Sequence, residues 1–451
     1  MKPVLFAAAC LGGVMSLSTA LAAESDTAAL QAEIEALKAD YEARLRALEA
    51  GQALPAMGAT GSRSPGSNAF NPAISAIVMG SYVSYDDALE RELAGFQLGG
   101  ETDYVPEGLS LNESELILSA NVDQRFYGQL TLGLHDGEEG AELDIEEAFF
   151  DTLGLPGGTG LRFGRFYSGI GYLNQHHPHA WNFHDAPLPY IAFLGGQFGD
   201  DGIRASWVAP TDLYLELGTE FYQGGRFPGG TDPDFGDVAT AFARIGGDVG
   251  RSHAWRAGLS ALWASPAGRE GGGHAHGGAV GPDVEFTGDS DLLIADVVWK
   301  WAPNGDYRRR SLTLQGEYFY RDERGAVEFA EAGESAELAY DGTQRGWYVE
   351  GVYGFNPRWR AGLRYERLST ANDLTVLGLT AGLTPDEVLE ESGLQEGDDP
   401  VRWGAMVDYS PSEFSRIRLQ YNRDETQGDG VNNVWVLQYV MSLGAHGAHA
   451  F

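Results

Sequence analysis

The chain has a single cysteine, Cys10, and it lies inside residues 1–22, which predict a secretory signal. This segment has a positive charge at its second residue, then an apolar stretch, then a small-x-small pattern at Ala20-Leu21-Ala22. Cleavage after it would leave a mature chain without cysteine. Disulfide bonds, thiol chemistry and cysteine-ligated metal sites are then excluded.

Basic residues, long apolar runs and catalytic motifs are also scarce. The 30 Lys and Arg face 65 Asp and Glu, and a net charge of −35 argues against binding to nucleic acid. After the signal, no window of 18 uninterrupted apolar residues predicts a membrane-spanning helix. Nucleophile-elbow, Walker and His-Glu-x-x-His motifs are missing, and His135 beside Asp136 is a weak acid–base signal. We therefore expect a protein that is not an enzyme.

Residues 23–50 carry the one clear helical pattern. Its apolar positions recur at spacings of three and four residues: Leu30, Ile34, Leu37, Tyr41, Leu45 and Leu48. Three heptads are too short to be stable alone, which favours a coiled coil between chains over a helix that lies on its own domain. Residues 51–72 are rich in Gly, Ala, Pro and Ser and predict a flexible linker.

From Ala73 onward the period changes to two, as in β-strands. Near the end, for example, Ile417 and Leu419 alternate with Arg416 and Arg418. Sixteen such segments are predicted: 73–85, 110–123, 125–135, 141–151, 160–168, 201–209, 212–222, 238–247, 252–264, 290–301, 309–321, 346–354, 358–369, 401–409, 414–423 and 432–443.

The connections between these segments are sorted by length. Those after even-numbered segments are short, and most of those after odd-numbered segments are long: 86–109, 169–200, 223–237, 265–289, 322–345 and 370–400. This alternation is typical of a transmembrane barrel, with periplasmic turns below and extracellular loops above. Tyr and Trp near segment ends predict aromatic girdles: Tyr85, Tyr222, Trp301, Tyr320, Trp347, Tyr409 and Trp435. The predicted fold is therefore all-β, a 16-stranded antiparallel transmembrane β-barrel over residues 73–451 in the Gram-negative outer membrane.

A resemblance to known outer-membrane proteins supports this fold. The terminal Phe451 resembles the signal recognised by the barrel-assembly machinery. Asn71-Pro72-Ala73-Ile74 and the segment from Gly171 to Trp181 resemble proteins with an N-terminal coiled coil, a porin-type barrel and histidine-bearing loops. Such proteins are often labelled zinc-regulated TonB-dependent receptors, and the architecture is also similar to trimeric and phosphate-selective-type porins. The resemblance implies a homotrimer embedded in lipid and lipopolysaccharide, with its coiled coil in the periplasm.

One part of that label conflicts with the sequence. TonB-dependent receptors have about 22 strands and a plug in the lumen. Here a helix and a short linker precede the first strand, which leaves no room for a plug domain. We therefore expect a porin.

Two sets of charges are expected to face each other across the lumen. Glu142, Asp144 and Glu146 lie opposite the apolar Leu143, Ile145 and Phe149 on one strand. The basic set lies on three strands near the C-terminus: Arg360, Arg364, Arg402, Arg416 and Arg418. Opposed walls of this kind produce a transverse field at a pore eyelet, whereas the alternative is that these charges pair with neighbouring strands. Loop 169–200 is rich in apolar residues and is expected to fold inward and form the constriction.

Histidines in two loops could bind a metal ion. The candidate ligands are His176, His177, His179, His184 and Asp185 in loop 169–200, and His274 and His276 in a glycine-rich loop. Imidazole and carboxylate suit zinc, but each group falls short of the four ligands of a closed site. We expect no resident cofactor beyond transient Zn²⁺ capture; a tight structural zinc site and ordinary polar loop residues are the alternatives.

Three functions follow from this sequence. The first is a porin for the diffusion of small hydrophilic solutes or ions. The second is an uptake channel or receptor for zinc. The third is a tether in which the coiled coil links the outer membrane to peptidoglycan.

Overall fold

The structure is a computed structural model, and it describes residues 72–86, 93–99, 102, 104–137, 140–272, 282–395, 397, 399–426 and 430–444. The predicted signal, coiled coil and linker lie outside the described residues, as do His274, His276 and Phe451. Within the described part of the chain, no helix is long and apolar enough to cross a membrane.

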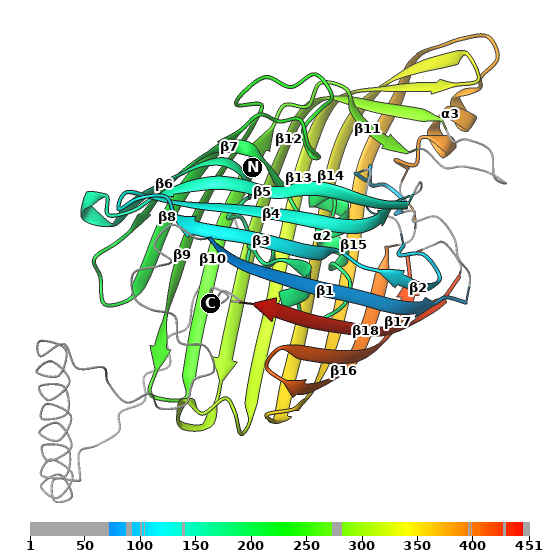
Figure 1. Cartoon of the computed structure of the whole chain (residues 1–451). Coiled ribbons are helices and arrows are strands. Elements are labelled where there is room, and N and C mark those ends of the chain that lie inside the picture. Colours follow the sequence, from blue (N-terminus) through cyan, green and yellow to red (C-terminus); the bar gives the residue numbers. More distant parts are fainter. Residues whose placement is uncertain are drawn as a thin grey trace, which may run out of the picture. The chain divides into compact units, whose positions relative to one another are not determined.

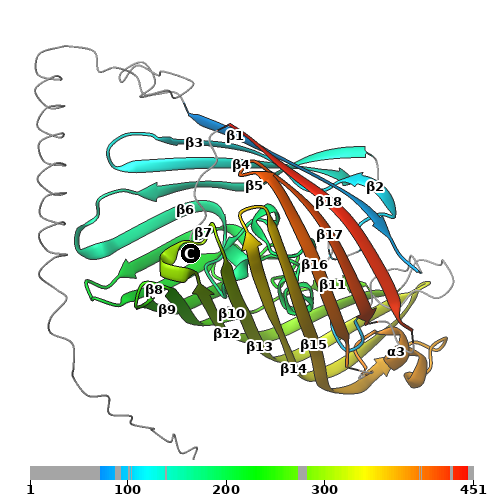
Figure 2. The same cartoon turned by 90° about the horizontal axis from the view of Figure 1, so that it is seen from below.

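The strands form one closed antiparallel sheet (Figures 1 and 2). β2 and β3 both pair with β1, and β10 and β11 both pair with β12, so each couple is one interrupted strand. β1 pairs with β18 and closes the ring, which confirms the predicted 16-stranded barrel. The segments are β1 (Ala73–Ser84), β2 (Gly108–Leu111), β3 (Ser114–Asn121), β4 (Phe126–Gly137), β5 (Gly140–Thr152), β6 (Thr159–Tyr167), β7 (Gly199–Val208), β8 (Tyr214–Tyr222), β9 (Val238–Val249), β10 (His253–Ala264), β11 (Arg269–Gly272), β12 (Asp283–Trp301), β13 (Ser311–Glu331), β14 (Glu334–Asn356), β15 (Trp359–Leu379), β16 (Val401–Ser412), β17 (Ser415–Glu425) and β18 (Asn432–Gly444).

The barrel is apolar outside and polar inside. On β17, Ile417 and Leu419 are exposed, whereas Arg418 and Gln420 between them are buried in the lumen. The alternation of exposed and buried side chains recurs on other strands, although β1 and β18 bury apolar residues such as Met79 and Val436. Exposed side chains such as Leu363 and Leu437 form an apolar outer surface. A sheet can present such a surface to lipid because closure leaves no strand edge unpaired.

Four strands run beyond their predicted ends. The predicted loop 322–345 is wrong: β13 and β14 continue through it as a hairpin, which turns at Ala332 and Gly333, both with positive φ. β15 likewise runs into the predicted loop 370–400, and β12 starts inside the predicted loop 265–289. The reason is a second apolar cluster beyond the barrel wall. It contains Phe286, Val327, Phe329 and Leu338, and Val388 of helix α3 (Pro385–Glu391) packs into it.

A β-bulge changes the face of β5. Thr131 pairs with Glu147, but the next residue, Leu132, pairs with Ile145, so Glu146 is the extra residue. The predicted outward position of Phe149 is therefore wrong, since it is buried inside and Phe150 points outward. Tyr222, predicted in an aromatic girdle, is also buried within the lumen.

The connection between β6 and β7, residues 168–198, lies inside the ring of strands, and we term it the inserted loop (Figure 1). It contains the short 3-10 helices η2 (Leu173–Gln175) and η3 (Pro178–Ala180) and the helix α2 (Leu188–Leu194). All seven residues of α2 are buried. The helix ends at Gly195, whose left-handed φ of 61° favours glycine. Two further 3-10 turns, η1 (Pro156–Gly158) and η4 (Pro303–Gly305), lie between other strands.

Candidate functional site in the barrel lumen

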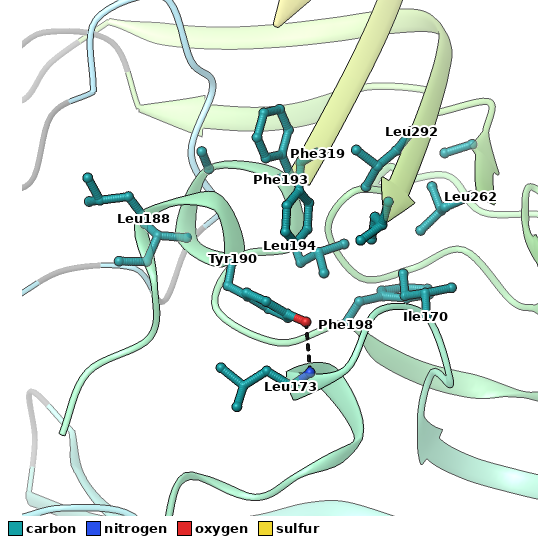
Figure 3. Close-up of a cluster of buried hydrophobic side chains, with 14 of the residues drawn as sticks. Ile170, Leu173, Leu188, Tyr190, Phe193, Leu194, Phe198, Leu262, Leu292 and Phe319 are labelled. Carbon is teal, nitrogen blue, oxygen red and sulfur yellow. Dashed lines mark hydrogen bonds between the residues drawn. The ribbon is translucent and has the colours of Figure 1, made fainter. Parts of the chain in front are cut away.

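One side of the inserted loop packs against β13, β14 and β15 through apolar side chains (Figure 3). The Phe193 ring stacks on Phe319, with ring centroids 5.6 Å apart and planes 9° apart, and Tyr190 meets the same ring edge-on. Gly346 of β14 permits this approach, because a Cβ atom there would lie 2.8 Å from the Phe193 ring. This dry contact fixes where the loop enters the lumen.

Carboxylates of the wall accept hydrogen bonds from backbone N–H groups of the inserted loop. Glu317 accepts from Tyr172 at 2.8 Å and Leu173 at 3.2 Å, and also from the Tyr190 hydroxyl. Glu366 accepts from the N–H of Leu188 at 2.5 Å. These backbone N–H groups have no partner within a helix or strand, so in a buried loop they need other acceptors.

The predicted arginines mostly bind the same loop. Four of the five donate to its backbone carbonyls: Arg364 to Asp185 at 2.9 Å, Arg402 to Ala186 at 2.6 Å, Arg416 to His179 at 2.8 Å and Arg418 to Trp181 at 3.0 Å. Arg360 pairs with Asp408, which also accepts from Arg418. Glu366 pairs with both Arg364 and Arg402. These arginines therefore position the inserted loop and are largely neutralised by acids of their own wall.

His184 and Asp185 lie against this arginine wall. The Asp185 carboxylate is 2.9 Å from a guanidinium nitrogen of Arg364 and of Arg402. Burial alone would raise the pKa of Asp185, but these two arginines hold it well below its ordinary value. Burial lowers the pKa of His184 to about 4, although Asp185 opposes the shift. A metal cation would be repelled here, so the structure separates these two predicted ligands from a cation site.

His177 and His179 lie on the opposite, acidic side. The His177 Nδ1 is 3.2 Å from Glu146 and 3.5 Å from Glu115, and its Nε2 is 3.1 Å from Glu147. The His179 Nδ1 is 2.7 Å from Glu115. Burial alone would lower the pKa of His177, but these carboxylates raise it well above its ordinary value. His176 instead packs against Tyr172, with ring centroids 4.8 Å apart and planes tilted by 58°.

A cavity of about 1180 Å³ lies between the inserted loop and the wall. Glu142, Asp144 and Glu146 line one part of it, as the sequence predicted for this face of β5. Asn422 and Asp424 line another part, together with Arg402, the one of the five predicted arginines that reaches this cavity. On the loop side the cavity is bordered by His184 and the charged Asp185, and also by Ile191 and Leu194 of α2.

Sequence reasoning missed the acids that complete these contacts. The sequence analysis did not single out Glu115 and Glu147 at the histidines, Glu317 and Glu366 at the loop backbone, or Asp408 beside Arg360 and Arg418. The signal for Glu115 was present, because it alternates with Leu116 and Leu118 on a short strand. Glu147 was hidden by the bulge in β5, which shifts the alternation by one residue.

Comparison with known proteins places the chain in a family. No family model matches it. An uncharacterized protein of Aquifex aeolicus (strain VF5) is 32% identical over 371 residues, which cover 76% of this chain and 70% of that protein. The two proteins belong to one family.

Among solved structures, the barrel of this family member is similar to a loop-deletion mutant of OmpT, an outer membrane protein of Vibrio cholerae. The TM-score is 0.50 at 11% identity, over 82% of this chain and 99% of that one. The outer membrane channel DcaP of Acinetobacter baumannii has a TM-score of 0.48 at 13% identity, over 82% and 97% of the two chains. An anion-selective porin from Comamonas acidovorans has 0.45 at 9%, over 82% and 99%. At 11% identity the likeness to OmpT shows a shared fold and nothing more. The other two structures have TM-scores below 0.50 and show less.

Proposed function

We propose that this protein is a diffusion channel for small hydrophilic solutes and ions in a Gram-negative outer membrane. The observation that carries the proposal is the division of the lumen. The inserted loop is anchored on one side and leaves a cavity of about 1180 Å³, whose lining mixes charged, polar and apolar side chains. A plugged or purely structural barrel has no need of such a space.

The narrow part of the channel lies beside the inserted loop, between β5 and the strands β16 and β17. Solutes pass Glu142 and Asp144 on one side and Arg402 with Asp424 on the other. The carboxylates that line the cavity outnumber its two guanidinium groups, those of Arg226 and Arg402. Charges lining a narrow, poorly screened lumen act strongly on ions, so the channel favours cations.

The rest of the assembly belongs to the same proposal. The short turns face the periplasm, residues 23–50 form a coiled coil there, and three chains associate in a bilayer that contains lipopolysaccharide. Phe451 binds the barrel-assembly machinery. These points are supported by the sequence, as is the alternative of a peptidoglycan tether, which depends on residues 23–50 outside the described part of the chain.

A cysteine scan in planar bilayers tests the channel, because the expected mature chain has no cysteine of its own. Asp144→Cys places a thiol at the cavity, and Leu143→Cys places one on the outer surface of the same strand. A bulky water-soluble thiol reagent should reduce the single-channel current of the first variant and leave that of the second unchanged. Absence of any stable current from the folded wild-type barrel would rule the channel out, and block in neither labelled variant would exclude this path.

A further inference from the structure

The imidazole of His177 is enclosed by carboxylates from two strands. Glu115 comes from β3 and Glu146 from β5, and each has an oxygen near the His177 Nδ1, at 3.5 Å and 3.2 Å. One ligand atom from each of the three residues lies within 4.8 Å of the other two. The carboxyl group of Glu113 also lies close to Glu146 and Glu115. The three side chains therefore converge from separate parts of the fold.

Several of the converging atoms make no hydrogen bond of regular geometry within the described residues. They are both carboxylate oxygens of Glu146, the Oε2 of Glu115 and the Nδ1 of His177. The Glu146 side chain is only 8% exposed, and that of Glu115 is fully buried. Buried polar atoms are rarely left unpaired, so a group of them around one point indicates a bound species.

The spacing of these atoms suits a small tetrahedral metal ion. Ligand atoms about 2.0–2.2 Å from such an ion lie about 3.3–3.6 Å from one another. The distances from the His177 Nδ1 to the two carboxylates, 3.2 Å and 3.5 Å, are close to this range. Imidazole and carboxylate donors are those that zinc and similar ions accept.

Two neighbouring residues hold the ligands in orientation. The His177 Nε2–H donates to Glu147, since a carboxylate can only accept, and this leaves Nδ1 available to an ion. Glu147 is itself held by Gln129 and by the N–H of Tyr167. The His179 Nδ1–H donates to the second oxygen of Glu115. A carboxylate behind a ligating histidine is the usual outer support of a zinc site.

We propose that Glu115, Glu146 and His177 bind a divalent transition-metal ion of the zinc type, with Glu147 and His179 as positioning residues. Three protein ligands leave one position open, and Glu146 borders the cavity, so the ion is reached from the lumen. The site joins the inserted loop to β3 and β5. It differs from the predicted ligand set, of which His177 alone is a ligand, and it does not depend on the channel proposal.

Calorimetric titration with Zn²⁺ tests the site in the detergent-solubilised mature protein without a polyhistidine tag. A background with His274, His276, His446 and His449 changed to Ala removes the local histidine pairs of the sequence. We expect one Zn²⁺ per chain. Glu146→Gln and His177→Gln should each weaken binding at least about tenfold. The matched controls, Glu142→Gln on the same face of β5 and His184→Gln in the same loop, should bind as the background does.

Two further measurements separate a lost site from a lost fold or a lost channel. Heat-modified gel migration shows whether each variant is a folded barrel, and absorption spectra of bound Co²⁺ report whether coordination is tetrahedral. Glu147→Ala should weaken binding, and Glu147→Gln, which keeps an acceptor for the His177 N–H, should restore part of it. Equal affinity in the background and in Glu146→Gln/His177→Gln, or no binding at all, would overturn the site. Conductance with a chelator present measures the channel separately.

Discussion

The two faces of the inserted loop differ in how they meet the barrel. The α2 face is dry, with Phe193 and Tyr190 packed on Phe319. The other face carries His177 beside the carboxylate of Glu146 and Asp185 beside the guanidinium of Arg364. His184 and Asp185 border the cavity. The apolar face therefore holds the loop in place, and the other face presents the charged groups. Apolar packing fixes the loop without sensitivity to solute or pH, so the second face can present charged groups at the opening.

The largest effect should come from breaking the dry face. Phe193→Ala removes the stacked ring from a fully buried position, and truncation of a buried Phe costs about 3–5 kcal/mol. Thermal unfolding in detergent should occur at lower temperature, and single-channel current should rise because the loop is less firmly held. Phe150→Ala, on the outer face of β5 with 54% exposure, is the matched control and should do neither. Wild-type current and stability in Phe193→Ala would show that this contact does not anchor the loop.

A smaller effect is expected from removing one arginine anchor of the charged face. Arg418→Met deletes the hydrogen bond to the Trp181 carbonyl and the pair with Asp408. Because Asp408 keeps Arg360, we expect destabilisation of about 1–3 kcal/mol, measured by thermal unfolding. Adding Asp408→Asn removes the carboxylate that has lost one of its two arginine partners and should recover part of the loss. A double variant less stable than the sum of the single changes would contradict this assignment.

Ion selectivity tests the charged lining of the cavity without disturbing the inserted loop. Glu142→Gln and Asp144→Asn together remove two carboxylates from the cavity lining. We expect the reversal potential of the wild type in a salt gradient to be that of a cation-selective channel, and the double variant to move it toward zero while the open-channel current changes little. Glu337→Gln is the control, since this exposed side chain lies on β14 and outside the cavity. An unchanged reversal potential would mean that the ions follow another path.

Much of the fold could be predicted because lipid and lumen impose a period of two on each strand. The strand number and the lining by Glu142 and Asp144 follow from that period alone. It could not show that β13 and β14 continue past the barrel wall, because a hairpin with charged residues resembles a loop in sequence. Nor could it show the bulge at Glu146, where one extra residue moves Phe149 and Glu147 to the lumen.

The side-chain contacts within the lumen could not be predicted from the sequence, for a different reason. Periodicity places Arg364, Arg402 and Arg418 on the inner face, but it does not say what they contact there. The structure shows that they hold the backbone of a segment some 200 residues earlier in the chain. The histidines were read as one ligand set because they are adjacent in sequence. An inward loop instead meets different walls along its length, and this separates His177 from His184.

The titration of His184 should change the stability only in acid. Its folded pKa of about 4 lies below the ordinary 6.5, so the unfolded chain takes up this proton first as the pH falls. Stability should therefore decline between about pH 6.5 and pH 4 through this residue, and be unaffected by it above that range. Unfolding temperatures of wild type and His184→Asn, compared from pH 7 to pH 4, isolate the contribution, because asparagine does not titrate. The difference between the two proteins should change with pH in the direction that favours His184→Asn in acid. A constant difference would mean that His184 meets solvent freely, and that the arginine face of the loop is less enclosed than its contacts with Arg364 and Arg402 indicate.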